Sequence, residues 1–98
     1  MKMGVFINDY KSVPDTVARL KADKLGFIFV QNGVFHATLK ENGKSSALLD
    51  KTANLYVLAE DIATRGLTEA DVDKRVKVVT YSDVVDLIFN DYEKLAWI

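Results

Sequence analysis

Two adjacent acids, Glu60 and Asp61, are the residues of this sequence whose type best suits proton transfer. They end an apolar run at residues 55–59, and Arg65 and Gly66 then close what can only be a very short helix. Adjacent strand side chains point to opposite faces, so the two carboxylates do not readily aim at one substrate atom. An acid at the end of a strand is also a natural N-cap for the next helix. The pattern therefore favours capping, with acid–base catalysis as the less favoured alternative.

His36 is the only histidine of the chain. A catalytic triad would need a nucleophile and an orienting acid beside it, and the sequence has no nucleophile elbow. A metal site would need further ligands at suitable spacing, and the sequence has no such cluster. We therefore expect no metal site and no cofactor, and we expect His36 to be a partly exposed surface or interface residue.

A polar turn, Gln31-Asn32-Gly33, directly follows the apolar run at residues 26–30. Polar side chains and a flexible backbone at a strand end are compatible with ligand binding, but the turn lacks a G-x-G-x-x-G pattern and a Walker lysine. The favoured interpretation is a tight turn in which Gly33 lets a helix approach a strand closely. Binding of a small ligand or nucleotide at this turn stays open as an alternative.

The last residues, 95–98, form an apolar tail that contains Trp97. A terminus frays unless something holds it, so an apolar tail indicates docking. The sequence leaves open whether Trp97 docks on the core of its own chain or on another subunit.

Composition limits the possible functions. The 98 residues have a net charge of −1, and residues 51–98 hold six bases against nine acids. A chain without a basic face is poorly suited to nucleic-acid binding. The sequence has no apolar stretch long enough for a membrane span and no signal-peptide core, so we expect a cytoplasmic protein that binds neither membrane nor nucleic acid. We expect residues 1–98 to form one domain.

Four apolar runs predict strands, and short amphipathic segments lie between them. The predicted strands are residues 4–7, 26–30, 55–59 and 76–80, and the last of them alternates as an edge strand does. A first helix is predicted from Ser12, Pro14 and Asp15, with Val13, Val17 and Leu20 on one face. Short helical segments are predicted at residues 34–40, which the turn signal Asn42-Gly43 closes, after Ser45 or Ser46, and after Thr68.

The clearest helix is the last. Its N-cap is predicted at Ser82, and Val85, Ile88, Phe89 and Tyr92 share one face. Alternating strands and helices predict an α/β fold, with an about four-stranded, mainly parallel sheet and helices on both faces. Ligands and partners of such sheets meet the loops at the carboxyl ends of the strands, here called the rim.

Two segments resemble the DsrH/TusB family of sulfur-relay proteins within the DsrE/DsrF/DsrH-like group. Residues 27–35, FIFVQNGVF, look like that family's apolar strand followed by Asn/Asp-Gly-Val-Tyr/Phe. Residues 57–67, VLAEDIATRGL, are very similar to its VYALAEDLAARGL stretch. Residues 78–87 and the tryptophan near the C-terminus also fit, so the resemblance extends from about residue 25 onward.

The resemblance implies a DsrEFH-like domain with flavodoxin-like layering. It also implies a complex with DsrE/TusD-like and DsrF/TusC-like subunits that passes persulfide sulfur along a relay, either toward 2-thiouridine at the tRNA wobble position or in sulfur oxidation. This chain has no cysteine, and only a thiolate can hold a persulfide. We therefore expect a non-catalytic subunit that acts by contact in a homo- or hetero-oligomer. A self-associating domain that binds a small ligand at the rim is the alternative, and an enzyme using Glu60 or Asp61 is the least favoured.

The rim and the tail supply the candidate partner contacts. These are Gln31, Asn32, Gly33, His36, Glu60, Asp61, Arg65 and Trp97.

Overall fold

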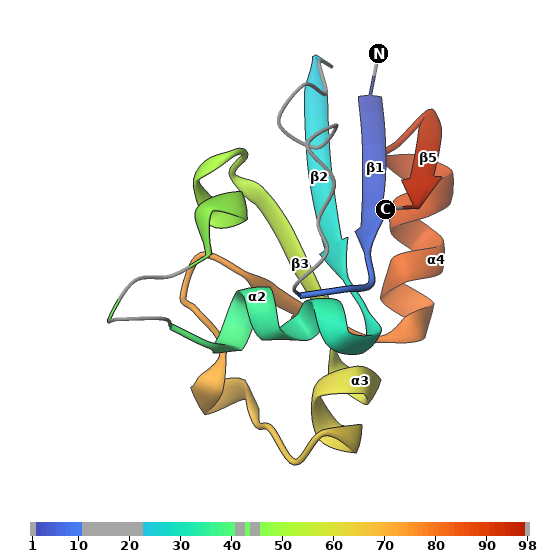
Figure 1. The fold of residues 1–98 in the computed structure, drawn as a ribbon. Helices are drawn as coiled ribbons and strands as arrows, with labels where there is room; N and C mark the ends of the chain where they lie inside the picture. Colours follow the sequence, from blue (N-terminus) through green and yellow to red (C-terminus); the bar gives the residue numbers. More distant parts are fainter. Residues whose placement is uncertain (1, 11–22, 41–42, 44–45, 98) are drawn as a thin grey trace.

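The computed structural model describes residues 2–10, 23–40, 43 and 46–97. The helix predicted from Ser12, with its stripe Val13, Val17 and Leu20, lies outside the described residues, as do Asn42 and Ser45. Five strands form one sheet in the order β4-β3-β2-β1-β5, and every neighbouring pair is parallel (Figure 1). The strands are β1 (Lys2–Ile7), β2 (Lys24–Phe29), β3 (Asn54–Leu58), β4 (Lys77–Val79) and β5 (Lys94–Trp97).

The predicted α/β class is confirmed, and the sheet has one strand more than expected. Each of the four apolar runs forms a strand, and the alternating run forms β4 at an edge of the sheet. The fifth strand is the C-terminal tail, which pairs with β1 and places Trp97 beside Phe6. The tail therefore docks on its own chain, which settles the alternative that the sequence left open.

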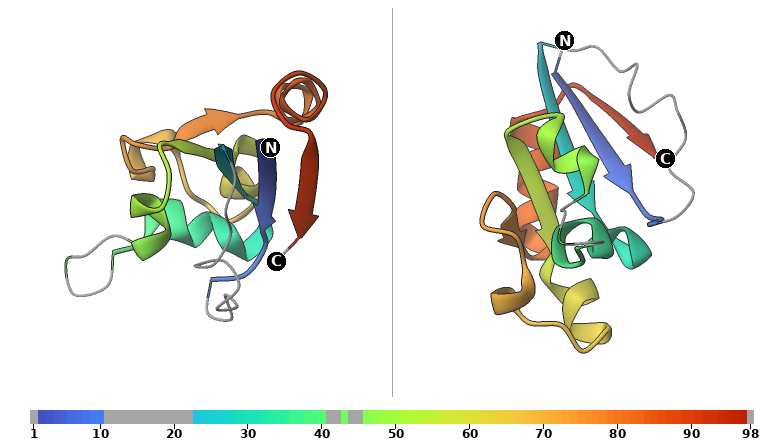
Figure 2. Two further views of the ribbon diagram at one scale, coloured as in Figure 1. Left: turned by 90° about the horizontal axis from the view of Figure 1, so that it is seen from above. Right: turned by 60° about the vertical axis from the view of Figure 1, so that its left-hand side comes forward.

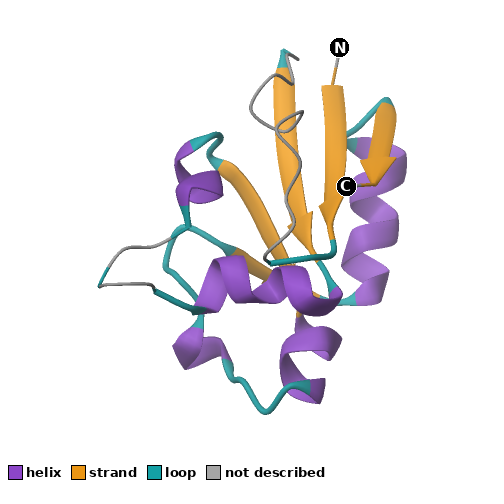
Figure 3. Ribbon diagram, viewed as in Figure 1, coloured by secondary structure: helices purple, strands orange, loops and turns teal. Residues whose placement is uncertain are grey.

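Helical segments follow β2, β3 and β4 (Figure 3). The 3₁₀ turn η1 (Gln31–Val34) leads into α2 (Phe35–Thr38), and a second turn, η2 (Ala47–Asp50), precedes β3. After β3 come α3 (Ala59–Thr64) and η3 (Glu69–Asp71), and α4 (Tyr81–Asn90) connects β4 to β5.

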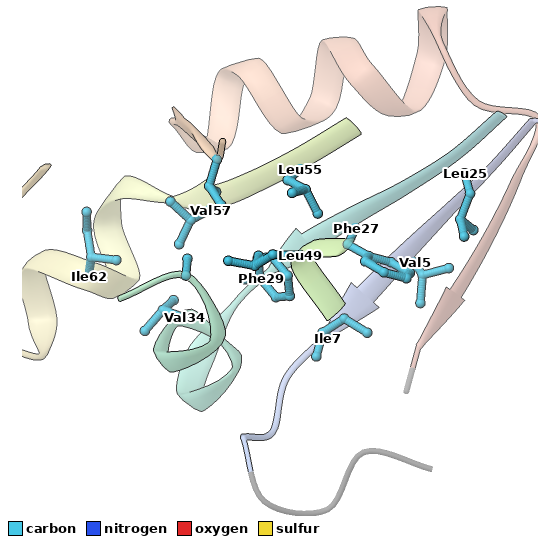
Figure 4. Close-up of a cluster of buried hydrophobic side chains, with 12 residues drawn as sticks. Val5, Ile7, Leu25, Phe27, Phe29, Val34, Leu49, Leu55, Val57 and Ile62 are labelled. Atoms are coloured by element: carbon cyan, nitrogen blue, oxygen red, sulfur yellow. The ribbon is translucent and has the colours of Figure 1, made fainter. Parts of the chain in front are cut away.

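Helices lie on both faces of the sheet, as the sequence predicts. Viewed from above, α2 lies on one side of the strands and α4 on the other (Figure 2, left). The alternation of strand side chains divides the buried apolar residues between two clusters. The larger cluster contains Val5, Ile7, Phe27, Phe29 and Val57, which meet Val34, Leu49 and Ile62 from the connections (Figure 4).

The smaller cluster lies under α4. It joins Ile28, Leu58 and Val79 of the sheet to Val84 and Ile88 of the helix. The apolar face predicted for this helix was wrong in part, because Val85 and Phe89 are 49% and 80% exposed.

The turns around the sheet begin and end through local hydrogen bonds. Helix α4 begins two residues earlier than predicted, because Thr80 rather than Ser82 is its N-cap and the Oγ1 of Thr80 accepts from the Asp83 N–H. The Ser46 hydroxyl accepts from the Leu48 N–H at the start of η2, as predicted. Helix α3 ends in a Schellman motif, in which Gly66 has φ of 72° and the Leu67 N–H donates to the Ile62 carbonyl.

Candidate functional site

The two acids after β3 hold the ends of the strands on either side. The Asp61 carboxylate accepts a hydrogen bond of 2.7 Å from the Gln31 N–H, just after β2. The Glu60 carboxylate accepts one of 3.3 Å from the Tyr81 N–H, which opens α4 after β4. Because β3 lies between β2 and β4, this acid pair ties three consecutive connections together at the rim.

The prediction that one of these acids is the N-cap of the helix after β3 was wrong. The N-cap of α3 is Leu58, which makes no side-chain cap, and Glu60 and Asp61 lie in the first turn. Carboxylates there interact favourably with the positive end of the helix dipole. Their hydrogen bonds, however, run to neighbouring segments, a cross-strand role that the sequence did not predict.

The polar turn after β2 is held by the same helix. Gln31 has φ of 50°, a conformation uncommon for a residue other than glycine, and its N–H is the group bound by Asp61. The Asn32 side-chain oxygen accepts from the Nε and Nη2 of Arg65, at 3.2 and 3.1 Å. Arg65 Nη1 donates in turn to the Asp61 carbonyl at 3.1 Å. We call Gln31, Asn32, Asp61 and Arg65 the rim network.

Gly33 is required by close packing, as the sequence predicts. A Cβ at this position would lie 1.8 Å from the Ile7 carbonyl oxygen, so only glycine fits between η1 and the end of β1.

Trp97 forms one wall of an open cavity of about 270 Å³ beside the rim network. Its ring stacks on Phe6 with 4.5 Å between ring centroids and an interplanar angle of 14°. The cavity is mostly apolar, and its polar wall is formed by side chains of the rim network. Its lining residues are Phe6, Val30, Gln31, Leu58, Asp61, Tyr81, Val84 and Trp97.

Phe6 and Tyr81 line this cavity but are not among the candidate residues taken from the sequence. Phe6 belongs to the cavity only because β5 pairs with β1, and Tyr81 because α4 starts immediately after β4. The signal that points to Tyr81 is its position directly after the predicted strand at residues 76–80, which places it at the rim.

His36 lies away from the rim network and is buried, so the expected partly exposed histidine is wrong. Its ring packs between Tyr10 and Phe29, with centroids 4.9 and 5.7 Å away. Nε2 donates to the Asp9 carbonyl at 2.9 Å, and the Ser46 hydroxyl donates to Nδ1 at 2.7 Å. Burial lowers the pKa of His36, so the neutral ring is the form that fits.

The candidate residues divide between the rim and the rest of the sheet. Within residues 2–10, 23–40, 43 and 46–97, no group of three or more histidine, cysteine, aspartate or glutamate side chains could hold a metal ion. Of the candidate residues, the structure brings Gln31, Asn32, Glu60, Asp61, Arg65 and Trp97 to one rim. Gly33 packs against the end of β1, and His36 packs on Phe29, on the face of the sheet that α2 covers. Among the described helices, none is long and apolar enough to cross a membrane.

Comparison with known proteins points to one family. A family model described as DsrH like protein matches residues 10–94. Protein TusB of Photorhabdus laumondii is 37% identical over 83 residues, covering 85% of each chain. Protein TusB of Erwinia tasmaniensis is 37% identical over 81 residues, covering 83% of each.

A solved structure agrees with the fold. The solution NMR structure of protein Tm0979 from Thermotoga maritima superposes with a TM-score of 0.59 and 24% sequence identity, covering 91% of this chain and 94% of that one. It supports the architecture alone, whereas the family model and the relatives cover most of the sequence. This chain therefore belongs to the DsrH family.

Proposed function

We propose that this protein is a non-catalytic subunit of a cytoplasmic sulfur-relay complex and supports persulfide transfer by DsrE/TusD-like and DsrF/TusC-like subunits. The observation that carries the proposal is that this chain belongs to the DsrH family and has no cysteine. Persulfide sulfur needs a thiolate acceptor, so a partner subunit must supply it. This chain then contributes a surface that assembles the complex.

The geometry of the rim supports a contact role over catalysis or ligand binding. Asp61 and Glu60 bind backbone N–H groups, and the Asn32 side-chain oxygen accepts from Arg65. Polar groups that already bind one another are poorly placed to bind a nucleotide without first breaking those hydrogen bonds. The rim network is therefore better suited to shaping a surface than to recognising a small ligand.

Association with purified partners tests the proposal. The chain is co-expressed with the DsrE- and DsrF-like subunits of the same genome, and the mass of the purified assembly is measured by light scattering. A stable complex containing all three chains is expected. A chain that elutes alone at micromolar concentration in the presence of both subunits would contradict the proposal.

Labelling with sulfur tests the division of roles within that complex. When a cysteine desulfurase delivers ³⁵S from labelled cysteine, the label is expected on a partner subunit and not on this chain. Covalent label on this chain after denaturing, non-reducing electrophoresis would contradict the non-catalytic role.

For the pathway, we propose 2-thiolation of the tRNA wobble uridine over sulfur oxidation, because the curated relatives carry the TusB name. Deletion of the gene should remove 2-thiouridine from total tRNA nucleosides, as measured by mass spectrometry. An unchanged 2-thiouridine content would assign the chain to another sulfur pathway.

A further inference from the structure

Helix α4 covers only part of its face of the sheet. Helices α2 and α3 pack on one face of the sheet, and α4, which returns the chain from β4 to β5, packs on the other. Five strands span about 19 Å at about 4.8 Å between neighbours. A helix with side chains is about 10 Å wide. One helix can therefore cover about half of this face.

The covered part reaches from β4 to β1. Val84 and Ile88 of α4 belong to one cluster with Ile28, Leu58 and Val79, which Phe6 of β1 also joins. On the β4 side of the helix the surface is polar, where Asp83, Asp86, Asn90 and Asp91 line a shallow cavity with Lys77. The opposite flank of α4 therefore faces β1 and β5.

That flank and β5 form a groove of large apolar side chains, which we call the α4–β5 groove. Tyr81, Val85 and Phe89 recur every four residues along α4 and are 58%, 49% and 80% exposed. Leu95 and Trp97 project from β5 on the same face, because Leu95 lies against Gly4 and Trp97 stacks on Phe6. They are 44% and 64% exposed. The cavity beside Trp97 and Tyr81 forms one end of this groove.

Five large apolar side chains exposed side by side are characteristic of an interaction surface. Isolated exposed apolar residues need no such explanation, but these five come from one helix and one strand, and α4 and β5 lie next to each other (Figure 1). Tyr and Trp are also the residue types that most often dominate binding energy at protein interfaces.

The charges around the groove indicate the partner's chemistry. Helix α4 carries Asp83 and Asp86 and no basic residue, and Glu60 and Asp61 lie at its N-terminal end. Lys77 lies on the other flank of α4, and the base described at the far end of the groove is Lys24, which lies over the Tyr92 ring at 5.1 Å. A partner with lysine or arginine beside its apolar residues would complement the acidic end and flank.

We propose that the α4–β5 groove is the docking surface for a partner subunit of the relay complex, which lays an amphipathic helix with basic flanks into the groove between α4 and β5. Such a helix would cover the apolar side chains that α4 and β5 leave exposed. The inference rests on the proposed function, because it names the surface through which that complex forms.

The central test is the affinity of Phe89→Asp for the purified DsrE/DsrF-like subunits. Phe89 is 80% exposed, so the variant should fold with an unchanged melting temperature. Its dissociation constant should rise at least about tenfold, the effect of losing one well-packed aromatic contact. The matched control is Leu39→Asp, which is 43% exposed and follows α2 on the opposite face, and it should bind like the wild type.

The sole tryptophan provides a second readout that does not depend on a substitution. Because Trp97 is largely exposed in the groove, its emission should shift to shorter wavelength when the partner subunits bind. Partner subunits with their tryptophans replaced by phenylalanine keep this signal specific. The variant Asp86→Asn removes one acid of α4 and leaves the cap at Asp83 intact, and it should slow association and reduce its dependence on salt.

The outcomes separate this inference from the proposed function. If the wild-type chain binds no partner subunit, the proposed function fails. If the complex forms but Phe89→Asp binds within twofold of the wild type, the α4–β5 groove is not the docking surface and only this inference is overturned. If the wild-type chain alone sediments as a dimer that Phe89→Asp dissociates, the occupant is a second copy and the inference is likewise overturned.

Discussion

At the scale of single residues, Asp61 has a structural role that its sequence context did not reveal. Its carboxylate accepts the N–H of Gln31, whose φ of 50° is uncommon for a non-glycine residue. Asp61→Ala removes the acceptor and should lower the free energy of unfolding by about 1 kcal/mol, a typical net value for a hydrogen bond. Asp61→Asn keeps an acceptor oxygen and should lose less.

Urea denaturation measures both effects. Asp86→Ala is the matched control, because Asp86 is an exposed acid of α4 for which the structure shows no hydrogen bond, and it should stay within about 0.5 kcal/mol of the wild type. Equal losses for Asp61→Ala and Asp86→Ala would show that the hydrogen bond to Gln31 contributes nothing.

His36 should make the stability of the protein depend on pH. Burial lowers its pKa in the folded state below the ordinary value of 6.5, so the unfolded chain binds more protons as the pH falls through that value. Stability from His36 is therefore fully present above pH 6.5 and is lost as the pH falls toward the folded-state pKa. The limiting slope for one proton is about 1.4 kcal/mol per pH unit.

Urea denaturation at a series of pH values from 5 to 8 checks this dependence. His36→Gln keeps hydrogen-bonding groups but cannot titrate, so its free energy of unfolding should fall less steeply below pH 6.5. Parallel curves for the two proteins would assign the pH dependence to the carboxylates instead.

At the scale of elements, the turn η1 can pack closely against β1 because Gly33 has no side chain. A Cβ on residue 33 would lie 1.8 Å from the Ile7 carbonyl oxygen, and a backbone atom cannot move aside as a flexible side chain can. Gly33→Ala should therefore destabilise the protein by about 3 kcal/mol, at the upper end of overpacking effects.

The matched control for that substitution is Gly66→Ala. Gly66 has open space around its Cα and φ of 72°, so alanine there costs only backbone strain, about 1 kcal/mol. Thermal or urea unfolding compares the two variants. Equal destabilisation would show that close packing of η1 on β1 adds nothing to the effect of losing a glycine.

The sequence predicted elements well where one segment determines its own structure. The apolar runs predicted β1 to β4 within a few residues, and their alternation placed β4 at the edge. It could not predict β5, because this short, half-exposed strand depends on pairing with β1 at the opposite end of the chain.

The face of α4 shows the same limit. Val85 and Phe89 fit the period of a buried stripe, yet Val84 and Ile88 point at the sheet. Periodicity shows that a helix has an apolar face, but it does not show how much of that face packs on the helix's own core. The part of the apolar face of α4 that stays exposed forms one side of the α4–β5 groove. The rim network was missed for a related reason, since Gln31 and Asp61 meet only across neighbouring parallel strands.

At the scale of the whole molecule, β5 is the strand that pairs with the outer edge of β1. It covers the outer edge of β1, and Trp97 shields Phe6, which is only 6% exposed. Removing residues 94–98 would turn β1, a six-residue strand with a continuous apolar core segment, into an unpaired edge. An exposed, apolar edge strand is a template for pairing with other chains.

The truncated protein should therefore lose stability and aggregate in a concentration-dependent way. Trp97→Ala separates the two contributions of β5, because it removes the stacked ring but keeps the strand backbone paired with β1. It should lower the free energy of unfolding by about 1 kcal/mol, the scale of an aromatic pair, without causing aggregation. Static light scattering from 10 to 200 μM compares the two proteins at 25 °C. If both stay monodisperse, edge protection is not a function of β5; if both aggregate, the Trp97 ring rather than the paired backbone keeps the molecule monomeric.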